Sequence, residues 1–407
     1  MTSAAKVKPE AVAGPEGDFR RHWHLKRTVN LNHGSFGATP VAVLEQQEKL
    51  SREINADRWE FIMGDASARH EDARKALASF LRAPPDDLVF MDNVTEALHT
   101  VVKSLSLGAG DEVLVTNHMY GNYPAPLAEL AARQGFRIVK AEIPFPVLDD
   151  EQIMTPVLQA ATSCTKLAII DHITSPTAVI FPVKRIVAAL SERGIDTFVD
   201  GAHGAGMLDL DIPAIGAAYY GGNNHKWLCA PLASGFLHVA LEKQAAIIPV
   251  VGSGKAARDV PFTERFAWQG TKDLTPRLMV PETIRTMASL HPQGWPGIYK
   301  RNHDLIMAAR DMVAEAMNVK EQCPEHMTGS MVSIPLAGFK TGSAVEMHML
   351  RERLYRACLE RHGFGINVTA MDGQGMLRIT AHLYNSMDEY EWLAEILPGL
   401  MKEFRSV

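Results

Sequence analysis

Up to about residue 240, short apolar runs alternate with amphipathic stretches. Stretches with helical periodicity, such as residues 95–105 and 183–193, separate several of the runs. Apolar strands separated by amphipathic helices are typical of an α/β fold, so we predict a mainly parallel seven-stranded sheet sandwiched by helices. The seven predicted strands cover residues 88–91, 112–115, 137–139, 167–170, 197–199, 218–220 and 235–238.

After about residue 275 the pattern changes to longer helical stretches with brief strands near residue 330 and between residues 365 and 380. This change predicts a smaller C-terminal α+β domain. Because 407 residues are too many for one small core, we expect a large domain over 29–275, a small domain over 276–407 and a flexible arm over 1–28. The helical stretches cover residues 276–290, 298–317, 345–362 and 388–404.

Composition and charge are those of an ordinary globular protein, with 46% hydrophobic and 22% charged residues. The net charge of −6 does not favour nucleic acid or an anionic membrane, so a small polar substrate is expected. The four cysteines form no CxxC motif, and no stretch approaches the roughly 20 apolar residues of a membrane helix. The first 20 residues lack the apolar core of a signal peptide, so we expect a cytoplasmic protein.

Candidate chemistry centres on Asp200 and Lys226, which follow two neighbouring predicted strands. Ligands of parallel sheets gather at the carboxyl ends of the strands, where both side chains can face one flat cofactor. A lysine can hold an aldehyde as a Schiff base while a carboxylate keeps a pyridine nitrogen protonated, which is what pyridoxal phosphate requires. Alternatively, Asp200, His203 and His225 could bind a metal ion, but this leaves Lys226 without a role.

Other polar residues stand at the ends of predicted strands. Val94 and Thr95 open a helix after residues 88–91, where an ordinary N-cap and a phosphate cradle are both possible. Tyr120 follows residues 112–116 and could cap the core or stack on the cofactor ring; we favour it over His118 for stacking. Arg378 lies in an apolar strand, where its fork suits a substrate carboxylate better than an internal salt bridge.

Taken together, these motifs resemble the class V aminotransferase-like enzymes of pyridoxal phosphate fold type I, and most closely their isopenicillin N epimerase-like branch. The resemblance implies a homodimer and an amino acid, or a peptide with a free α-amino acid end, as substrate. It rests on residues 30–37, 93–95, 199–203, 225–228, 270–273 and 377–379.

The resemblance also implies a role for each site residue. Lys226 would hold the cofactor, Asp200 would pair with the ring nitrogen, His203 would bond the ring hydroxyl and Tyr120 would stack on the ring. Residues that would bind the phosphate are Val94, Thr95, Asn223, His225 and, from a second subunit, Thr271. Residues expected to bind the substrate are Asn32, Ser35 and Arg378. Two positions depart from the family pattern: Asn223 replaces a common serine, and Ser175 stands where many members have an asparagine.

In this family Lys226 would remove the α-proton of the substrate, and the next step decides the reaction. Epimerisation is our first expectation, with Tyr120 as the acid on the opposite face; a carbon–sulfur lyase and a transaminase remain open. We disfavour a persulfide-forming desulfurase, because neither Cys323 nor Cys358 stands where its mobile nucleophile is expected. A non-catalytic regulator is also disfavoured, since no basic DNA-binding segment is visible.

Overall fold

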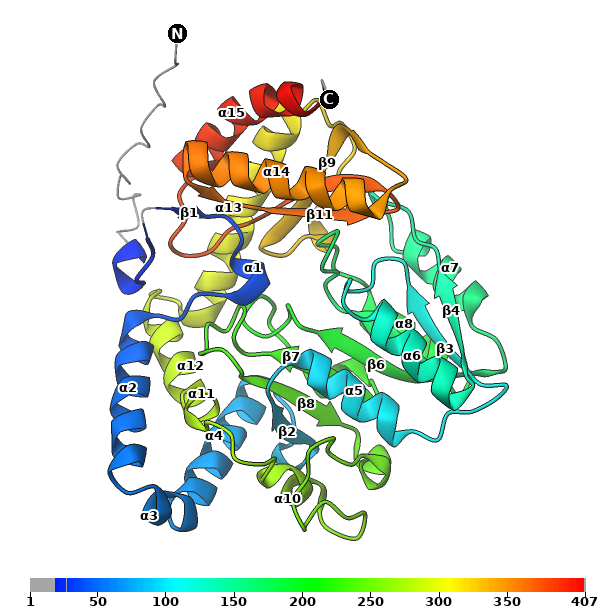
Figure 1. The fold of residues 1–407 in the computed structure, drawn as a ribbon, viewed down its shortest axis with the longest axis vertical. Coiled ribbons are helices and arrows are strands. Elements are labelled where there is room, and N and C mark those ends of the chain that lie inside the picture. Colours follow the sequence, from blue (N-terminus) through cyan, green and yellow to red (C-terminus); the bar gives the residue numbers. More distant parts are fainter. Residues whose placement is uncertain (1–18, 27, 406–407) are drawn as a thin grey trace.

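A seven-stranded sheet is the largest element of the computed structural model, which describes residues 19–26 and 28–405 (Figure 1). The strand order is β2-β8-β7-β6-β5-β3-β4, and only β8 runs antiparallel to its neighbours in this sheet. Each predicted run forms one strand, which confirms the predicted sheet. The strands are β2 (Leu88–Met91), β3 (Glu112–Thr116), β4 (Arg137–Ala141), β5 (Thr165–Asp171), β6 (Asp196–Gly201), β7 (Tyr219–Asn223) and β8 (Gly235–Val239).

Alternate side chains of the strands pack into two separate cores. In β5, Leu167 and Ile169 lie in one core and Ala168 and Ile170 in the other. Since successive side chains point to opposite faces of a sheet, strands that are apolar throughout need helices on both faces. One face is covered by α5 (Val94–Ser104), α6 (Pro124–Gln134) and α10 (Phe262–Ala267). The other is covered by α4 (Ala66–Phe80), α7 (Glu151–Ala160) and α8 (Val183–Ser191). In the same core, α2 (Val41–Ala56), α3 (Arg58–Met63) and α12 (Val280–Ser289) pack against α4 and one another.

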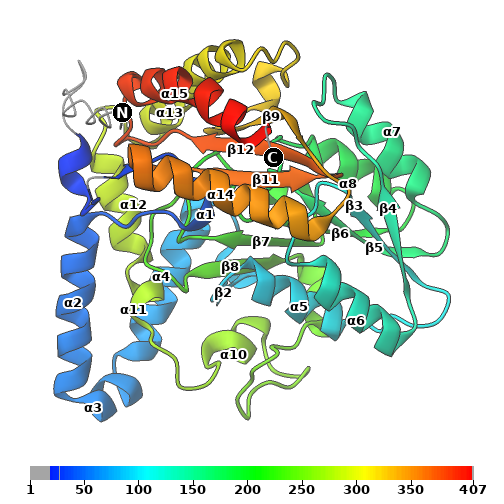
Figure 2. The ribbon, with the colours of Figure 1, turned by 45° about the horizontal axis from the view of Figure 1, so that its top comes forward.

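The C-terminal part is a three-stranded antiparallel sheet, ordered β11-β12-β9, with helices packed on it (Figure 2). This confirms the predicted smaller α+β unit. Val29 and Leu31 also lie in its core, because β1 (Val29–Asn30) pairs with β10 (Phe364–Gly365). The domain boundaries at residues 28 and 275 stay a prediction. The elements are β9 (Met331–Lys340), β11 (Asn367–Met371), β12 (Gln374–Thr380), α13 (Gly294–Ala316), α14 (Ala344–His362) and α15 (Met387–Arg405).

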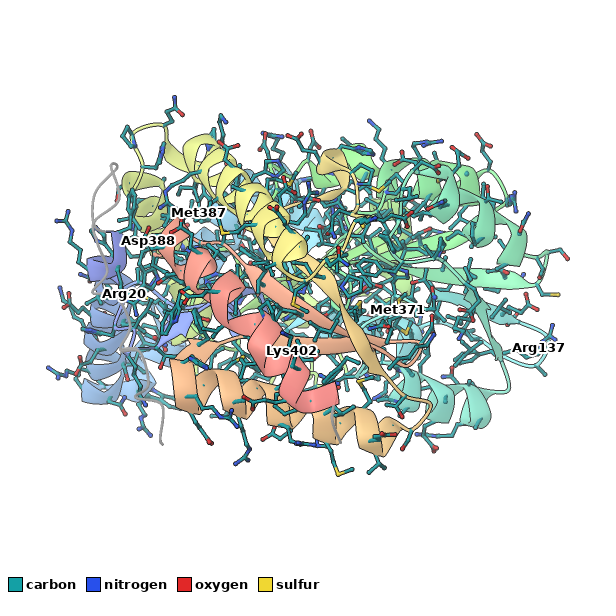
Figure 3. The ribbon with its side chains drawn as sticks, turned by 90° about the horizontal axis from the view of Figure 1, so that it is seen from above. Arg20, Arg137, Met371, Met387, Asp388 and Lys402 are labelled. Carbon is teal, nitrogen blue, oxygen red and sulfur yellow. The ribbon has the colours of Figure 1, made fainter. Side chains whose placement is uncertain are left out.

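Much of the predicted arm, residues 1–18 and 27, lies outside the described residues. The described part packs against the body of the protein: Trp23 is buried, and Arg20 pairs with Glu389 of α15 at 3.3 Å. Figure 3, seen from above, shows Arg20 beside the start of α15 at Met387 and Asp388. Within the described ranges, no helix combines the length and apolarity that a membrane span requires.

The helix expected over residues 276–290 is divided in two. Helix α11 (Thr275–Leu278) ends where α12 begins, and Pro281 occupies the first turn of α12. Proline has no amide hydrogen to continue the hydrogen bonding of a preceding helix, so the chain starts a new helix at this point. The carboxyl ends of β5, β6 and β7 carry the polar residues described next.

Candidate active site

Two adjoining cavities open at the carboxyl ends of the central strands. The carboxylate chamber, of about 530 Å³, is lined by Asp171 and Asp200. The arginine chamber, of about 380 Å³, is lined by Arg351 and Arg378. Both sizes suit a small molecule. The residues that line both chambers are Ser35, Phe36, Tyr120, Ser175 and Lys226.

Lys226 therefore lies at the boundary between the chambers. It occupies the turn after β7, and only 9% of its surface is exposed. Burial, and then the charge of Arg378, lower the pKa of its amine from 10.5 to about 8. An amine with this pKa is partly neutral near physiological pH, so it can act as a nucleophile or a base.

His203 contacts the amine of Lys226, with 3.3 Å between Nε2 and Nζ. The indole Nε1–H of Trp227 donates to Nδ1 of His203 at 3.1 Å. Because an indole nitrogen can only donate, Nδ1 must be the unprotonated nitrogen and Nε2 carries the hydrogen. Burial, together with the neighbouring charge of Lys226, holds the pKa of His203 well below its usual value. His203 thus presents an N–H donor to the chamber.

Asp200 is held in place by two donors. The hydroxyl of Tyr123 donates to Oδ2 at 2.6 Å, and the amide of Ala202 donates to Oδ1 at 2.8 Å. Asp171 is its direct partner on β5, so both carboxyl groups lie side by side. Burial raises the pKa of both groups, and that of Asp171 further through the charge of Asp200. A cationic ring nitrogen placed here would relieve this cost.

The first turn of α5 forms the opposite wall of the carboxylate chamber. Asn93 caps the helix by accepting from the amide of Glu96, and Asn223 accepts from the amide of Val94 at 2.9 Å. Thr95 also lines the chamber. The amides of Val94 and Glu96 are thus already bonded, which leaves the amide of Thr95 and the helix dipole to attract an anion. Val94, Thr95 and Asn223 are therefore gathered where a phosphate would bind.

His225 lies beside them but its ring is oriented by the backbone. Nδ1 donates to the carbonyl of Ser234 at 2.9 Å, and burial lowers its pKa to about 4. Its Nε2 is then an acceptor, and it becomes a donor to a phosphate only when the ring is protonated. Thr271 is exposed and is not among the residues that line the carboxylate chamber of its own chain.

Arg378, on β12, reaches the arginine chamber with hydroxyl and amide partners rather than an acid. Its Nη1 donates to the carbonyl and hydroxyl oxygens of Ser175, and its Nη2 donates to Ser35 at 2.9 Å and to Asn32 at 3.3 Å. Its Nε has no hydrogen-bond partner among the described residues. No carboxylate of these residues forms an ion pair with the Arg378 guanidinium. Burial lowers its pKa to about 10. The internal salt bridge considered from the sequence is absent from this part of the chain.

The side chains of Tyr120 and His118 lie at different sites in the structure. Tyr120 lines both chambers, and its ring centroid lies 6.0 Å from Nζ of Lys226. Its hydroxyl accepts from Nδ2 of Asn122 at 2.8 Å. His118 is buried elsewhere, against Thr177 and the carbonyl of Ile143. Of the two residues, only Tyr120 lines the chambers, and its stacking on the ring stays a prediction.

The turn over residues 32–37 packs against the backbone of His225 and Lys226. His33, in the short helix α1 (His33–Phe36), donates from Nε2 to the Lys226 carbonyl at 3.1 Å. Gly37 has φ of 77°, and a Cβ there would lie 2.3 Å from the His225 carbonyl oxygen. Only glycine fits this close approach without displacing the loop.

One cluster of possible metal ligands occurs among the described residues. It consists of His33, Cys229 and His382, whose ligand atoms all lie within 4.8 Å of one another. The two imidazole rings are stacked, with centroids 3.9 Å apart and planes at 13°. Stacked rings cannot both direct a lone pair at one ion, and Nε2 of His33 already donates to Lys226. These residues form a hydrogen-bonded network behind the lysine. The sequence also suggested a metal site of Asp200, His203 and His225, but the possible ligand atoms of these three residues do not all lie within 4.8 Å of one another.

The chain matches the family described as aminotransferase class-V over residues 34–393, and it belongs to this family. It is 32% identical to isopenicillin N epimerase of Streptomyces clavuligerus, over 92% of this chain and 95% of that protein. It is 27% identical to a probable chloroplastic L-cysteine desulfhydrase of Arabidopsis thaliana, over 97% and 87% of the two chains. The apo structure of a cysteine desulfurase from Thermococcus onnurineus matches it with a TM-score of 0.76 at 20% identity, covering 97% of this chain and 99% of that one.

Family membership confirms the predicted resemblance, the type I fold and the cofactor, pyridoxal phosphate. The residues present fit this cofactor. The carboxylate chamber offers a lysine for the aldehyde, two buried carboxyl groups for a ring nitrogen and a helix start for a phosphate.

Four residues of the site were not singled out from the sequence: Asp171, Tyr123, Trp227 as a donor to His203, and Arg351. Asp171 ends β5 as Asp200 ends its strand, so the same argument would have found it. Tyr123 and Trp227 become site residues only through contacts with Asp200 and His203. Arg351 lies on a helix that packing alone brings to the chamber.

Proposed function

We propose that this enzyme removes the α-proton of an amino acid substrate, with Lys226 as the base. The observation that carries the proposal is the position of Lys226, a buried amine that lines two chambers. One chamber suits the cofactor, and the other contains Arg378, which pairs with no carboxylate of the described residues. When bound, pyridoxal phosphate supplies a ring that accepts the charge left at the α-carbon.

The carboxylate chamber would bind and orient this cofactor. Asp200, fixed by Tyr123, would keep the ring nitrogen protonated, and the Nε2–H of His203 would donate to the ring hydroxyl. Val94, Thr95, Asn223 and His225 would hold the phosphate. Since Nε2 of His225 is an acceptor in the neutral ring, phosphate binding would favour its protonated form.

The arginine chamber would bind the substrate. Arg378 would form a paired hydrogen bond with the α-carboxylate, assisted by Asn32 and Ser35. Its partners in the structure are neutral oxygens, which a carboxylate can displace because a charge-assisted bond is stronger. This contact would place the α-hydrogen toward Lys226.

For the reaction itself we propose epimerisation, with Tyr120 as the acid on the face away from Lys226. The Tyr120 hydroxyl accepts from Asn122, which leaves its own hydrogen free to be donated. A relative with this activity, isopenicillin N epimerase, supports the choice.

A carbon–sulfur lyase is the second candidate, supported by the similarity to an L-cysteine desulfhydrase. Direct elimination of sulfide needs no protein thiol. None of the four cysteines, all in the described part of the chain, lines either chamber. Burial also raises the pKa of Cys358 to about 12, which keeps it a thiol. A route through a protein persulfide therefore stays disfavoured.

The proposal includes a homodimer in which Thr271 of each chain reaches the phosphate in the other. The exposed position of Thr271 supports this arrangement. The cytoplasmic location also stays a prediction.

A panel of amino acids incubated with the enzyme in heavy water tests the proposal. Deuterium at the α-carbon with inversion indicates epimerisation, pyruvate with released sulfide indicates a lyase, and a keto acid indicates a transaminase. We expect Tyr120→Phe to exchange the α-proton but to lose inversion. Full racemising activity in this variant would contradict the assignment of Tyr120 as the acid. Exchange of the α-proton that persists in Lys226→Ala would contradict the assignment of Lys226 as the base.

A further inference from the structure

The arginine chamber contains a second guanidinium that the proposed reaction does not use. Arg351, on α14, lines the chamber together with Arg378. Its Nε donates to the carbonyl of Val368, which directs the rest of the fork away from that bond. Among the described residues, neither arginine forms an ion pair with a carboxylate. One cavity thus holds two guanidinium charges that no carboxylate in the described part of the chain neutralises.

The strand β11 fixes the two arginines beside one another. Asn367 pairs directly with Arg378 across β11 and β12, so both side chains point to the same face of the sheet. Thr369, two residues further, lines the same chamber. The carbonyl that anchors Arg351 belongs to Val368, between them. Helix α14 packs along β11, so this anchor is a part of the fold (Figure 2).

The two arginines differ in their place relative to the lysine. Arg378 bonds to Ser35 and Ser175, which line both chambers as Lys226 does. Arg351 lines only the arginine chamber and bonds to Val368, which lines neither. Arg378 is therefore anchored at the boundary with the reacting amine, and Arg351 is anchored away from it. A ligand that reaches from Lys226 past Arg378 arrives at Arg351.

We propose that the substrate carries a second carboxylate, remote from its α-carbon, and that Arg351 binds it while Arg378 binds the α-carboxylate. The assignment of the α-carboxylate rests on the proposed function. Two like charges in a partly desolvated cavity repel one another, and a dianionic ligand relieves this repulsion while forming charge-assisted bonds at both ends. An amino acid with an apolar side chain leaves Arg351 without a negatively charged partner.

Binding of acids that lack an amino group tests the proposal without any reaction. Titration calorimetry of the cofactor-loaded enzyme compares glutarate, adipate and pimelate with monocarboxylates of the same chain length. Glutarylglycine, whose second carboxylate ends a peptide, separates a peptide-like substrate from a small amino diacid. We expect at least one dicarboxylate to bind about tenfold more tightly than its monocarboxylate partner, about 1.4 kcal/mol.

Two variants and a control locate the effect. In Arg351→Gln, whose amide can still donate to Val368, the dicarboxylate should bind no better than the monocarboxylate, while monocarboxylate affinity is unchanged. Arg351→Lys keeps the charge and should keep part of the preference. The control Arg356→Gln changes an exposed arginine of the same helix, paired with Glu352, and should keep all of it. Equal affinity for both acids in the unchanged enzyme, or a preference that survives in Arg351→Gln, overturns the proposal.

Exchange of the α-proton in heavy water separates this inference from the proposed function. If amino acids exchange but dicarboxylates gain no affinity, only the role of Arg351 fails. If dicarboxylates bind through Arg351 but no amino acid exchanges, the proposed reaction fails and the diacid site stands as a binding site.

Discussion

At the scale of single residues, Lys226 is defined by its surroundings more than by its type. Burial and Arg378 favour its neutral form, while Asp200 and Asp171 favour the charged one. The outcome is a pKa of about 8 instead of 10.5. His203 contributes an oriented N–H because Trp227 fixes its tautomer. The reactive amine and its neighbours are thus prepared before any ligand binds.

This pKa predicts how cofactor uptake depends on pH. A lysine reacts with an aldehyde as the neutral amine, so uptake by cofactor-free enzyme should accelerate as pH rises toward about 8 and level off above it. A lysine with its ordinary pKa of 10.5 would keep gaining rate well above pH 9. Stopped-flow absorbance across this range measures the profile. A rate that is still climbing steeply above pH 9 would contradict the lowered pKa.

At the scale of elements, the loop that carries Lys226 is held by the turn over residues 32–37. Gly37→Ala should displace this loop, because the new Cβ meets the carbonyl oxygens of His225 and Lys226 at 2.3 and 2.5 Å. The left-handed backbone adds a cost of about 1–3 kcal/mol. We expect a lower unfolding midpoint and weaker cofactor binding, measured by thermal denaturation and by titration with pyridoxal phosphate.

Gly110→Ala is the matched control for Gly37→Ala. Gly110 also has a positive φ, of 96°, but an added Cβ meets nothing within 4 Å. Gly110→Ala should therefore lose only the stability that a positive φ costs a residue with a Cβ, and its cofactor binding should be unchanged. Equal cofactor affinity in both variants would mean that Gly37 does not position the lysine.

The elements were predicted unevenly, for physical reasons. The inner strands of the central sheet are buried on both faces, so each appears as an apolar run that the sequence alone reveals. The edge strand β4 is largely exposed, and the sequence shows it only as the short run at residues 137–139. The break at Pro281 was missed because the periodicity of residues 276–290 continues across it. Asp200 and Lys226 could be predicted because they follow apolar runs, and Arg378 because it interrupts one. Arg351 was not, since an arginine on a polar helix looks solvated until packing places it in a chamber.

At the scale of the whole molecule, a shared site predicts that two damaged chains can restore one another. Each Lys226→Ala chain has an intact Thr271, and each Thr271→Ala chain has an intact Lys226. Unfolded and refolded together, they should form mixed dimers with one undamaged site, so cofactor retention and α-proton exchange should exceed those of either variant refolded alone. Sedimentation gives the oligomeric state. No gain on mixing, or a monomer, would contradict the shared site.

The central claim is that Lys226 binds the cofactor, and chemical reduction of the loaded enzyme tests it most directly. Borohydride makes the bond between a lysine and pyridoxal phosphate permanent, and mass spectrometry of the digest locates it. We predict a pyridoxyl group on the peptide that contains Lys226, together with visible absorbance that Lys226→Ala lacks. A label on another lysine, or an unlabelled Lys226 in fully loaded enzyme, would contradict the account.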